Sequence, residues 1–158
     1  MIVGLFAMKD FAVAKIRKDL IGAAGVYHVT SELSRRGLVA LPTVRNAAAA
    51  DVLVWSPSSG RHAVLQVKTS QEKVKFWPTS GPGTCLRGSR AFYVFLRWNQ
   101  EGQCFECFLE SARKVVSQVE QHLADQQQQG QEAFPFWTLP QDARAIKALT
   151  RRWRNWRP

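Results

Sequence analysis

Apolar residues recur every three or four positions in three stretches of the chain, which predicts three helices. The first is expected over residues 11–36, with Gly37 as its stop, and the others over 111–129 and about 141–156. Gly22 and Gly25 lie inside the first stretch, where each interior glycine costs about 1 kcal/mol relative to alanine. They indicate either a close approach of the helix backbone to another segment or a break near residue 22.

Short runs rich in β-branched and aromatic residues predict five strands between the first two helices. These are expected over 38–42, 51–56, 61–68, 91–98 and 104–110, and the turn residues SPSSG join the second and third into an antiparallel hairpin. Residues 69–90 predict a long basic loop, with an irregular hairpin as the alternative, and FPFWTLP predicts another loop. The order of elements predicts an α/β fold with a mixed, curved five-stranded sheet flanked by helices. We expect one domain over residues 1–158, with a motif core at about 20–110 and C-terminal helices over 111–158.

The charge balance points to a polyanionic partner. The 158 residues include 22 Lys and Arg against 12 Asp and Glu, a formal net charge of +10. An excess of this size in a small domain is typical of proteins that bind nucleic acid. The alternative is a basic protein whose charge serves only solubility.

The N-terminus and the cysteines suggest a cytoplasmic protein without a membrane segment. The apolar run in MIVGLFAMKD is too short for a membrane span and lacks the preceding basic residues of a signal peptide. Three cysteines, an odd number, argue against a secreted disulfide framework. Cys104 and Cys107 are an odd number of positions apart in a predicted strand, so we expect them on opposite faces, as packing residues rather than metal ligands.

Two polar residues interrupt the apolar strand VLQVKTS. Gln66 and Lys68 are two apart, so their side chains share one face of the strand. The hairpin places Asp51, at the start of the preceding strand, beside them. Carboxylate and amide oxygens suit Mg²⁺, and a lysine can position water or stabilise charge on a phosphate. The alternative is that Asp51 only satisfies backbone amides and that Lys68 only extends into water.

The motifs around these residues resemble a known family. Residues 25–37 (GVYHVTSELSRRG), a Pro-x-x-x-Asn connector at 42–46, then DVLVW, a turn and LQVKTS occur in the order found in the PD-(D/E)xK nuclease superfamily. The chain is most similar to the branch whose last motif is Q-x-K, which includes homing endonucleases and many uncharacterised bacterial proteins. The resemblance covers about residues 20 to 75.

The resemblance implies a restriction-endonuclease-like fold and phosphodiester hydrolysis that depends on Mg²⁺, or on Mn²⁺ in its place. It implies that Asp51 is a metal ligand, that Gln66 takes the usual acidic position in the metal or water shell, and that Lys68 is the catalytic lysine. One departure is that Val26 stands where the family commonly has a glutamate pointing into the site. Glu32 is expected to pair with Arg36 or His28 instead, and His28 to lie on the helix surface.

Basic and aromatic residues outside the motif are candidates for contacts with double-stranded DNA, because cations neutralise phosphates and aromatic rings stack on bases. The alternatives are a solvated loop with its aromatic side chains tucked inward, and C-terminal tryptophans that serve the core or a dimer. A homo-oligomer is compatible with the resemblance. The nucleic-acid-binding candidates are Arg45, Lys73, Lys75, Trp77, Arg87, Arg90, Arg151 and Arg154.

Three functions follow from these observations. The first is a DNA-binding endonuclease. The second is a protein of the same fold that binds nucleic acid without catalysis, which Val26 and the neutral Gln66 favour. The third is a protein-interaction module that uses the tryptophan-rich C-terminal face.

Overall fold

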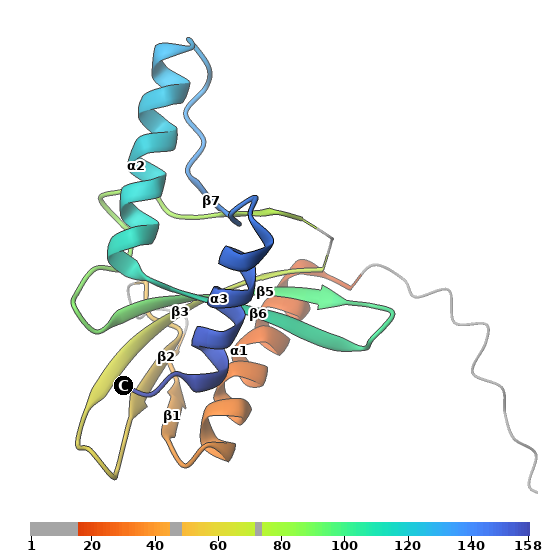
Figure 1. Cartoon of the computed structure of the whole chain (residues 1–158), viewed down its shortest axis with the longest axis vertical. Coiled ribbons are helices and arrows are strands. Elements are labelled where there is room, and N and C mark those ends of the chain that lie inside the picture. The colour runs from red at the N-terminus through yellow and green to blue at the C-terminus, as the bar shows by residue number, and fades with distance from the viewer. Residues whose placement is uncertain (1–15, 45–48, 72–73) are drawn as a thin grey trace, which may run out of the picture.

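A five-stranded mixed sheet in the order β1-β2-β3-β5-β6 forms the centre of the molecule (Figure 1). The structure is a computed structural model, and it describes residues 16–44, 49–71 and 74–158. β3 and β5 are parallel, and the other neighbours in this sheet are antiparallel. The predicted α/β class and mixed five-stranded sheet are confirmed. The strands are β1 (Val39–Pro42), β2 (Val52–Trp55), β3 (His62–Ser70), β5 (Ala91–Asn99) and β6 (Cys104–Ser111).

Three helices flank the sheet: α1 (Lys18–Arg35), α2 (Ala112–Gln128) and α3 (Ala143–Asn155). The predicted start of α1 at residue 11 lies outside the described residues, and residues 16 and 17 are not helical. Gly37 follows α1 with φ of 78°, a left-handed conformation that favours glycine and ends the helix as predicted.

The two glycines inside α1 have different surroundings. A Cβ at Gly25 would clash with Thr69 Oγ1 on β3, so glycine is needed for the close approach of α1 to the sheet. A Cβ at Gly22 would meet no heavy atom within 4 Å. Packing therefore explains Gly25 but not Gly22, and the helix is unbroken at both positions.

A small second sheet corrects the two predicted loops. β4 (Phe76–Pro78), inside the expected basic loop, pairs with β7 (Phe136–Thr138), inside the expected loop FPFWTLP. Trp77 and Trp137 are opposite each other in this pair, and both rings lie against Phe95 of the main sheet. The burial of these aromatic rings stabilises two strands that are too short to show a periodic pattern.

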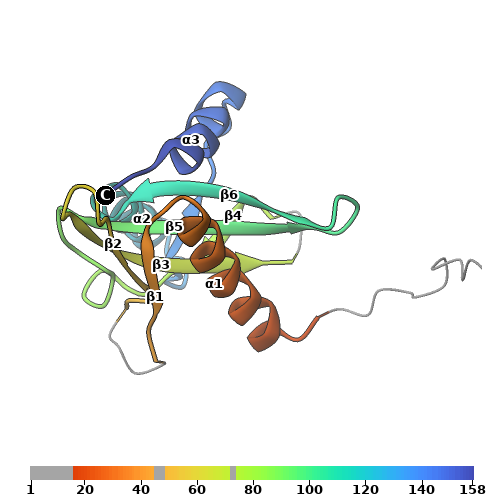
Figure 2. The ribbon, with the colours of Figure 1, turned by 90° about the horizontal axis from the view of Figure 1, so that it is seen from below.

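The two faces of the main sheet carry separate cores. On one face, α1 contributes Val29 and Leu33, and on the other α2 contributes Val115 and Val119 beside Trp77. α3 lies along the outer strand β6, beyond the edge of the sheet in Figure 2. It thereby covers an edge that would otherwise be open to pairing with another chain.

The C-terminal tryptophans belong to the core. Trp153 and Trp156 are 4% and 7% exposed and pack in the same core as α1, while Leu149, one turn earlier on α3, packs in the other. The two tryptophans therefore offer no exposed apolar face to a partner. No helix in the described part of the chain is long and apolar enough to cross a membrane.

Candidate active site

The β2–β3 hairpin brings Asp51 next to the strand that carries Gln66 and Lys68. Val52 pairs with Leu65, and Asp51 N also donates to Leu65 O at 2.9 Å, so Asp51 and Val52 both lie opposite Leu65, as in a β-bulge. Gln66 and Lys68 share one face of β3, and Leu65 and Val67 share the other. The hairpin therefore places Asp51 beside the end of β3 that carries Gln66 and Lys68, and the convergence of the three side chains stays a prediction. Their roles in chemistry stay predictions.

Asp51 is a half-buried carboxylate with little internal compensation. Its Oδ2 accepts a hydrogen bond from Val67 N at 2.7 Å, and Oδ1 has no hydrogen-bond partner among the described residues. Burial raises the pKa of the Asp51 carboxyl, and the Val67 N–H and the Lys68 ammonium lower it by less. A carboxylate in this position gains from a proton or a cation at its open oxygen.

Gln66 carries a second oxygen without a partner. The residue is 7% exposed, and its Oε1 is buried with no hydrogen-bond partner within the described part of the chain. A buried acceptor left unsatisfied costs about 1–3 kcal/mol. Leu65 and Val67, on either side of it, are packed in the core and hold the strand in place. A cation or a hydrogen-bond donor that reached Gln66 Oε1 would remove this cost.

A cavity of about 400 Å³ opens beside Asp51. Its other walls come from α1 and from the chain around the end of β1, and include Lys18, Gly22, Val26 and Thr43. Val26 is the position at which the resembled family commonly has a glutamate. A longer side chain at position 26 is therefore placed to reach the space beside Asp51.

The open oxygens of Asp51 and Gln66 are of the chemical kind that a small, hard cation prefers. Mg²⁺ prefers oxygen ligands and is commonly held by one or two carboxylates together with several waters and substrate phosphates. Asp51 Oδ1 and Gln66 Oε1 are such oxygens. Within residues 16–44, 49–71 and 74–158, no three His, Cys, Asp or Glu side chains gather in a metal-binding cluster. Water and phosphate would therefore have to supply most of the ligands.

The other predicted nucleic-acid contacts have varied surroundings. Trp77 is 1% exposed and its Nε1 donates to Leu96 O at 3.0 Å, so it has no free face for a base, which corrects that expectation. Arg87 is exposed but pairs with Glu120 at 3.2 Å. Arg45 and Lys73 lie outside the described residues. Lys75, Arg90, Arg151 and Arg154 are exposed, and their contacts with nucleic acid stay predictions.

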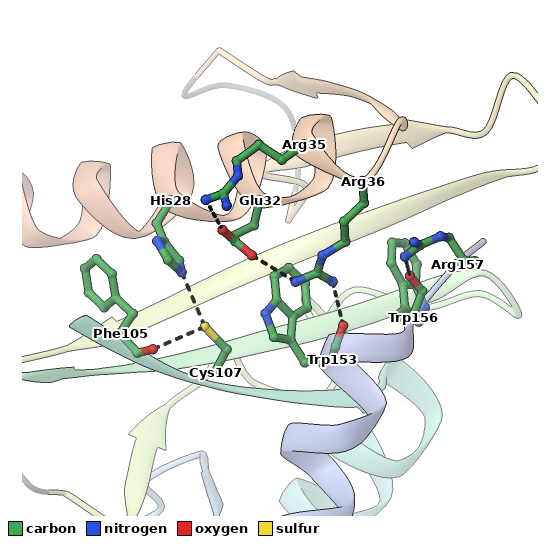
Figure 3. A network of polar contacts seen from close by, with 9 residues as sticks. All are labelled: His28, Glu32, Arg35, Arg36, Phe105, Cys107, Trp153, Trp156 and Arg157. Carbon is green, nitrogen blue, oxygen red and sulfur yellow. Dashed lines mark hydrogen bonds and ion pairs between the residues drawn. The ribbon is translucent and has the colours of Figure 1, made fainter.

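A second polar cluster joins α1 to α3 (Figure 3). Glu32 accepts from Arg36 at 3.1 Å and from Arg35 at 3.0 Å, which confirms the predicted pair with Arg36. Arg36 also donates to Trp153 O at 2.7 Å, and its guanidinium lies 4.6 Å from the centroid of the Trp153 ring. The carboxylate and both cations are paired, so this cluster stabilises the fold. The spacing of Glu32 and Arg36 shows their pairing, but the contact with Trp153 needs the tertiary structure.

His28 and Cys107 extend this cluster across to β6 (Figure 3). His28 is half-buried rather than on the helix surface, with its Nε2 3.6 Å from Cys107 Sγ. Burial lowers the pKa of His28 and raises the pKa of the Cys107 thiol to about 12. A neutral imidazole beside a protonated thiol serves packing. Cys107 is buried and Cys104 exposed, as expected for opposite faces of the strand.

Comparison with known proteins identifies no family for this chain. No protein-family model matches it, and no curated protein matches its sequence. Among solved structures, the bacterial homing endonuclease I-Ssp6803I is similar to it with 10% sequence identity and a TM-score of 0.49, over 82% of this chain and 80% of that chain. A likeness of this degree assigns neither a family nor an activity to the protein.

Proposed function

We propose that this protein binds double-stranded DNA and hydrolyses its phosphodiester bonds with Mg²⁺, or Mn²⁺, at the site formed by Asp51, Gln66 and Lys68. One observation carries the proposal. Asp51 bonds to Leu65, the neighbour of Gln66 on β3, and Asp51 and Gln66 each have an oxygen without a hydrogen-bond partner among the described residues. The resemblance of the motif to PD-(D/E)xK nucleases and the net charge of +10 support the same proposal.

Each residue has a role that its surroundings allow. Asp51 Oδ1 and Gln66 Oε1 would hold the metal ion, which when bound supplies positive charge for the phosphate and lowers the pKa of a bound water. Lys68 would orient the attacking water or stabilise the negative charge that develops on the phosphate. Its ammonium already lowers the pKa of Asp51, which favours the ionised carboxylate that a metal ligand needs.

A second candidate is a protein of nuclease-like fold that binds nucleic acid without cleaving it. Val26 favours it, because the cavity beside Asp51 then has an apolar wall where the resembled family commonly supplies a glutamate. Gln66 is neutral as well, so Asp51 is the only carboxylate of the motif. Fewer anionic ligands weaken Mg²⁺ binding.

Cleavage of supercoiled plasmid with Mg²⁺ or Mn²⁺ tests the two candidates. The wild type is expected to nick the plasmid, and Asp51→Ala and Lys68→Ala to lower the rate by at least about 100-fold, as for loss of a group that acts on the reacting centre. Lys114→Ala, which changes an exposed lysine on α2, is the matched control and is expected to keep the wild-type rate.

The outcomes separate the candidates. If no variant and no metal gives cleavage while salt-sensitive DNA binding persists, the non-catalytic candidate is correct. If the wild type does not bind DNA even at low salt, both candidates are wrong.

A further inference from the structure

α3 carries a row of four cations along its outer face. Arg144, Lys147, Arg151 and Arg154 are three, four and three residues apart, so they lie within one side of a helix with 3.6 residues per turn. All four are exposed, while Leu149 and Trp153 on the opposite side are buried. At 1.5 Å per residue, the row is about 15 Å long.

These four side chains have no internal role in the described structure. None of them forms a side-chain hydrogen bond or ion pair with another described residue, and α3 itself has no acidic residue. The neighbouring Arg152 contrasts with them, because it pairs with Glu110 at 2.6 Å and anchors α3 to β6. Cations that stabilise the fold are thus paired, and the outer row is left to solvent or to a partner.

The row is held in a fixed position. Asp142 caps the start of α3 by accepting from Arg144 N and Ala145 N, and Arg36 donates to Trp153 O near its end. Buried Trp153 and Trp156 fix the same end in the core. A rigid helix that presents four cations binds an extended anion without first having to be ordered.

We infer that α3 is a docking surface for the sugar-phosphate backbone of double-stranded DNA, separate from the Asp51 site; this rests on the proposed function. Each DNA strand carries a phosphate about every 3.4 Å along the helix axis, so a 15 Å row faces about four of them. A membrane surface fits less well, because the apolar side of α3 is buried in the core and cannot enter a bilayer. α3 lies on β6, and β5 separates β6 from β3, the strand beside Asp51. A duplex would therefore contact α3 and the Asp51 site at separate points.

The test compares two quadruple variants with the same loss of charge. In the first, Arg144, Lys147, Arg151 and Arg154 are each changed to Gln. In the control, four exposed cations on other elements, Arg35, Arg61, Arg113 and Lys114, are each changed to Gln. Binding of the full chain to a fluorescent 30-base-pair duplex is measured by anisotropy at several salt concentrations, and circular dichroism checks that both variants fold.

The α3 variant is expected to bind the duplex at least about tenfold more weakly than the wild type. The magnitude of the slope of log affinity against log salt concentration is expected to fall by about 3 to 4, because each phosphate contact contributes about 0.9. The control is expected to change the slope by less than about 1. Equal changes in the two variants would overturn this inference alone, because only total charge would then matter. A wild type that binds no duplex at low salt would overturn the proposed function with it. Loss of binding to anionic vesicles by the α3 variant, with DNA binding unchanged, would replace DNA by a membrane as the occupant.

Discussion

Two polar clusters lie beside α1, and they differ in how completely their groups are paired. In the cluster around Glu32, the carboxylate binds two arginines, and Arg36 also binds the end of α3. In the cluster around Asp51, one carboxylate oxygen and the amide oxygen of Gln66 have no partner among the described residues. Polar groups that stabilise a fold are normally paired within it. The unpaired oxygens of Asp51 and Gln66 are therefore the feature on which the proposed site rests.

The two interior glycines of α1 repeat this difference along a single helix. Gly25 is needed for packing because Thr69 leaves no room for a Cβ. Gly22 has room for one and lines the cavity beside Asp51. A glycine that packing does not require costs stability, and we propose that at Gly22 this cost keeps the cavity open for binding.

Removing Arg36 is the largest expected change in stability. Arg36→Ala leaves Glu32 and Trp153 O without this partner, and we expect the free energy of unfolding in urea to fall by about 2–3 kcal/mol. Arg35→Ala is the control, because Arg35 binds the same Glu32 but its side chain is 78% exposed, and we expect a loss below about 0.5 kcal/mol. Similar losses for the two variants would contradict a structural role for the Glu32 cluster.

Adding a carboxylate to the cavity beside Asp51 tests whether the Asp51 cluster, unlike the Glu32 cluster, can bind a metal ion. Val26→Glu places an acidic side chain in the wall beside Asp51, and we expect Mn²⁺ to bind about tenfold more tightly, a gain of about 1.4 kcal/mol. Tyr27→Glu, on an exposed residue lining the same cavity, controls for the added charge. Isothermal titration calorimetry measures both, and an equal gain in the two variants would show that only overall charge matters.

Gly22→Ala tests whether the cavity wall is kept open at the expense of stability. We expect the free energy of unfolding to rise by about 1 kcal/mol and Tm by about 2–4 °C, because alanine is the better helix former and meets no neighbour. We also expect weaker DNA binding or slower cleavage, since the added methyl group enters the cavity. A more stable variant with unchanged binding and cleavage would separate Gly22 from the site.

The pH dependence of stability gives the smallest expected effect. Because the pKa of Asp51 is raised in the folded state, that state holds this proton more firmly than the unfolded state. The contribution of Asp51 to stability therefore decreases as the pH rises from about 4 through the folded-state pKa, and is constant above it. In metal-free buffer we expect the Tm of Asp51→Asn minus that of the wild type to grow over this range, measured by thermal unfolding. If the Tm difference between Asp51→Asn and the wild type shrank with rising pH, the Asp51 carboxylate would not be destabilised by its burial.

The sequence was most informative where a pattern is long or local. The repeats of Val115 and Val119 predicted α2, and the turn before β3 predicted the hairpin that brings Asp51 beside the end of β3. The pairing of β4 with β7 was not predictable, because each strand has three residues and its partner is far away in the sequence. The burial of Trp77 depends on that pairing. The missing hydrogen-bond partner of Gln66 Oε1 was also not predictable, because it depends on all the residues that surround this oxygen in the folded structure.

Thermal unfolding of the wild type and Asp51→Asn, in EDTA and in Mg²⁺, tests the Asp51 site most directly. Asparagine can still accept the hydrogen bond of Val67 N, but it lacks the poorly compensated charge. We predict that Asp51→Asn has the higher Tm in EDTA at pH 7, and that Mg²⁺ raises the Tm of the wild type only. A lower Tm for Asp51→Asn in EDTA, with equal responses to Mg²⁺, would contradict the account and make Asp51 a residue that only completes the hydrogen bonds of β3.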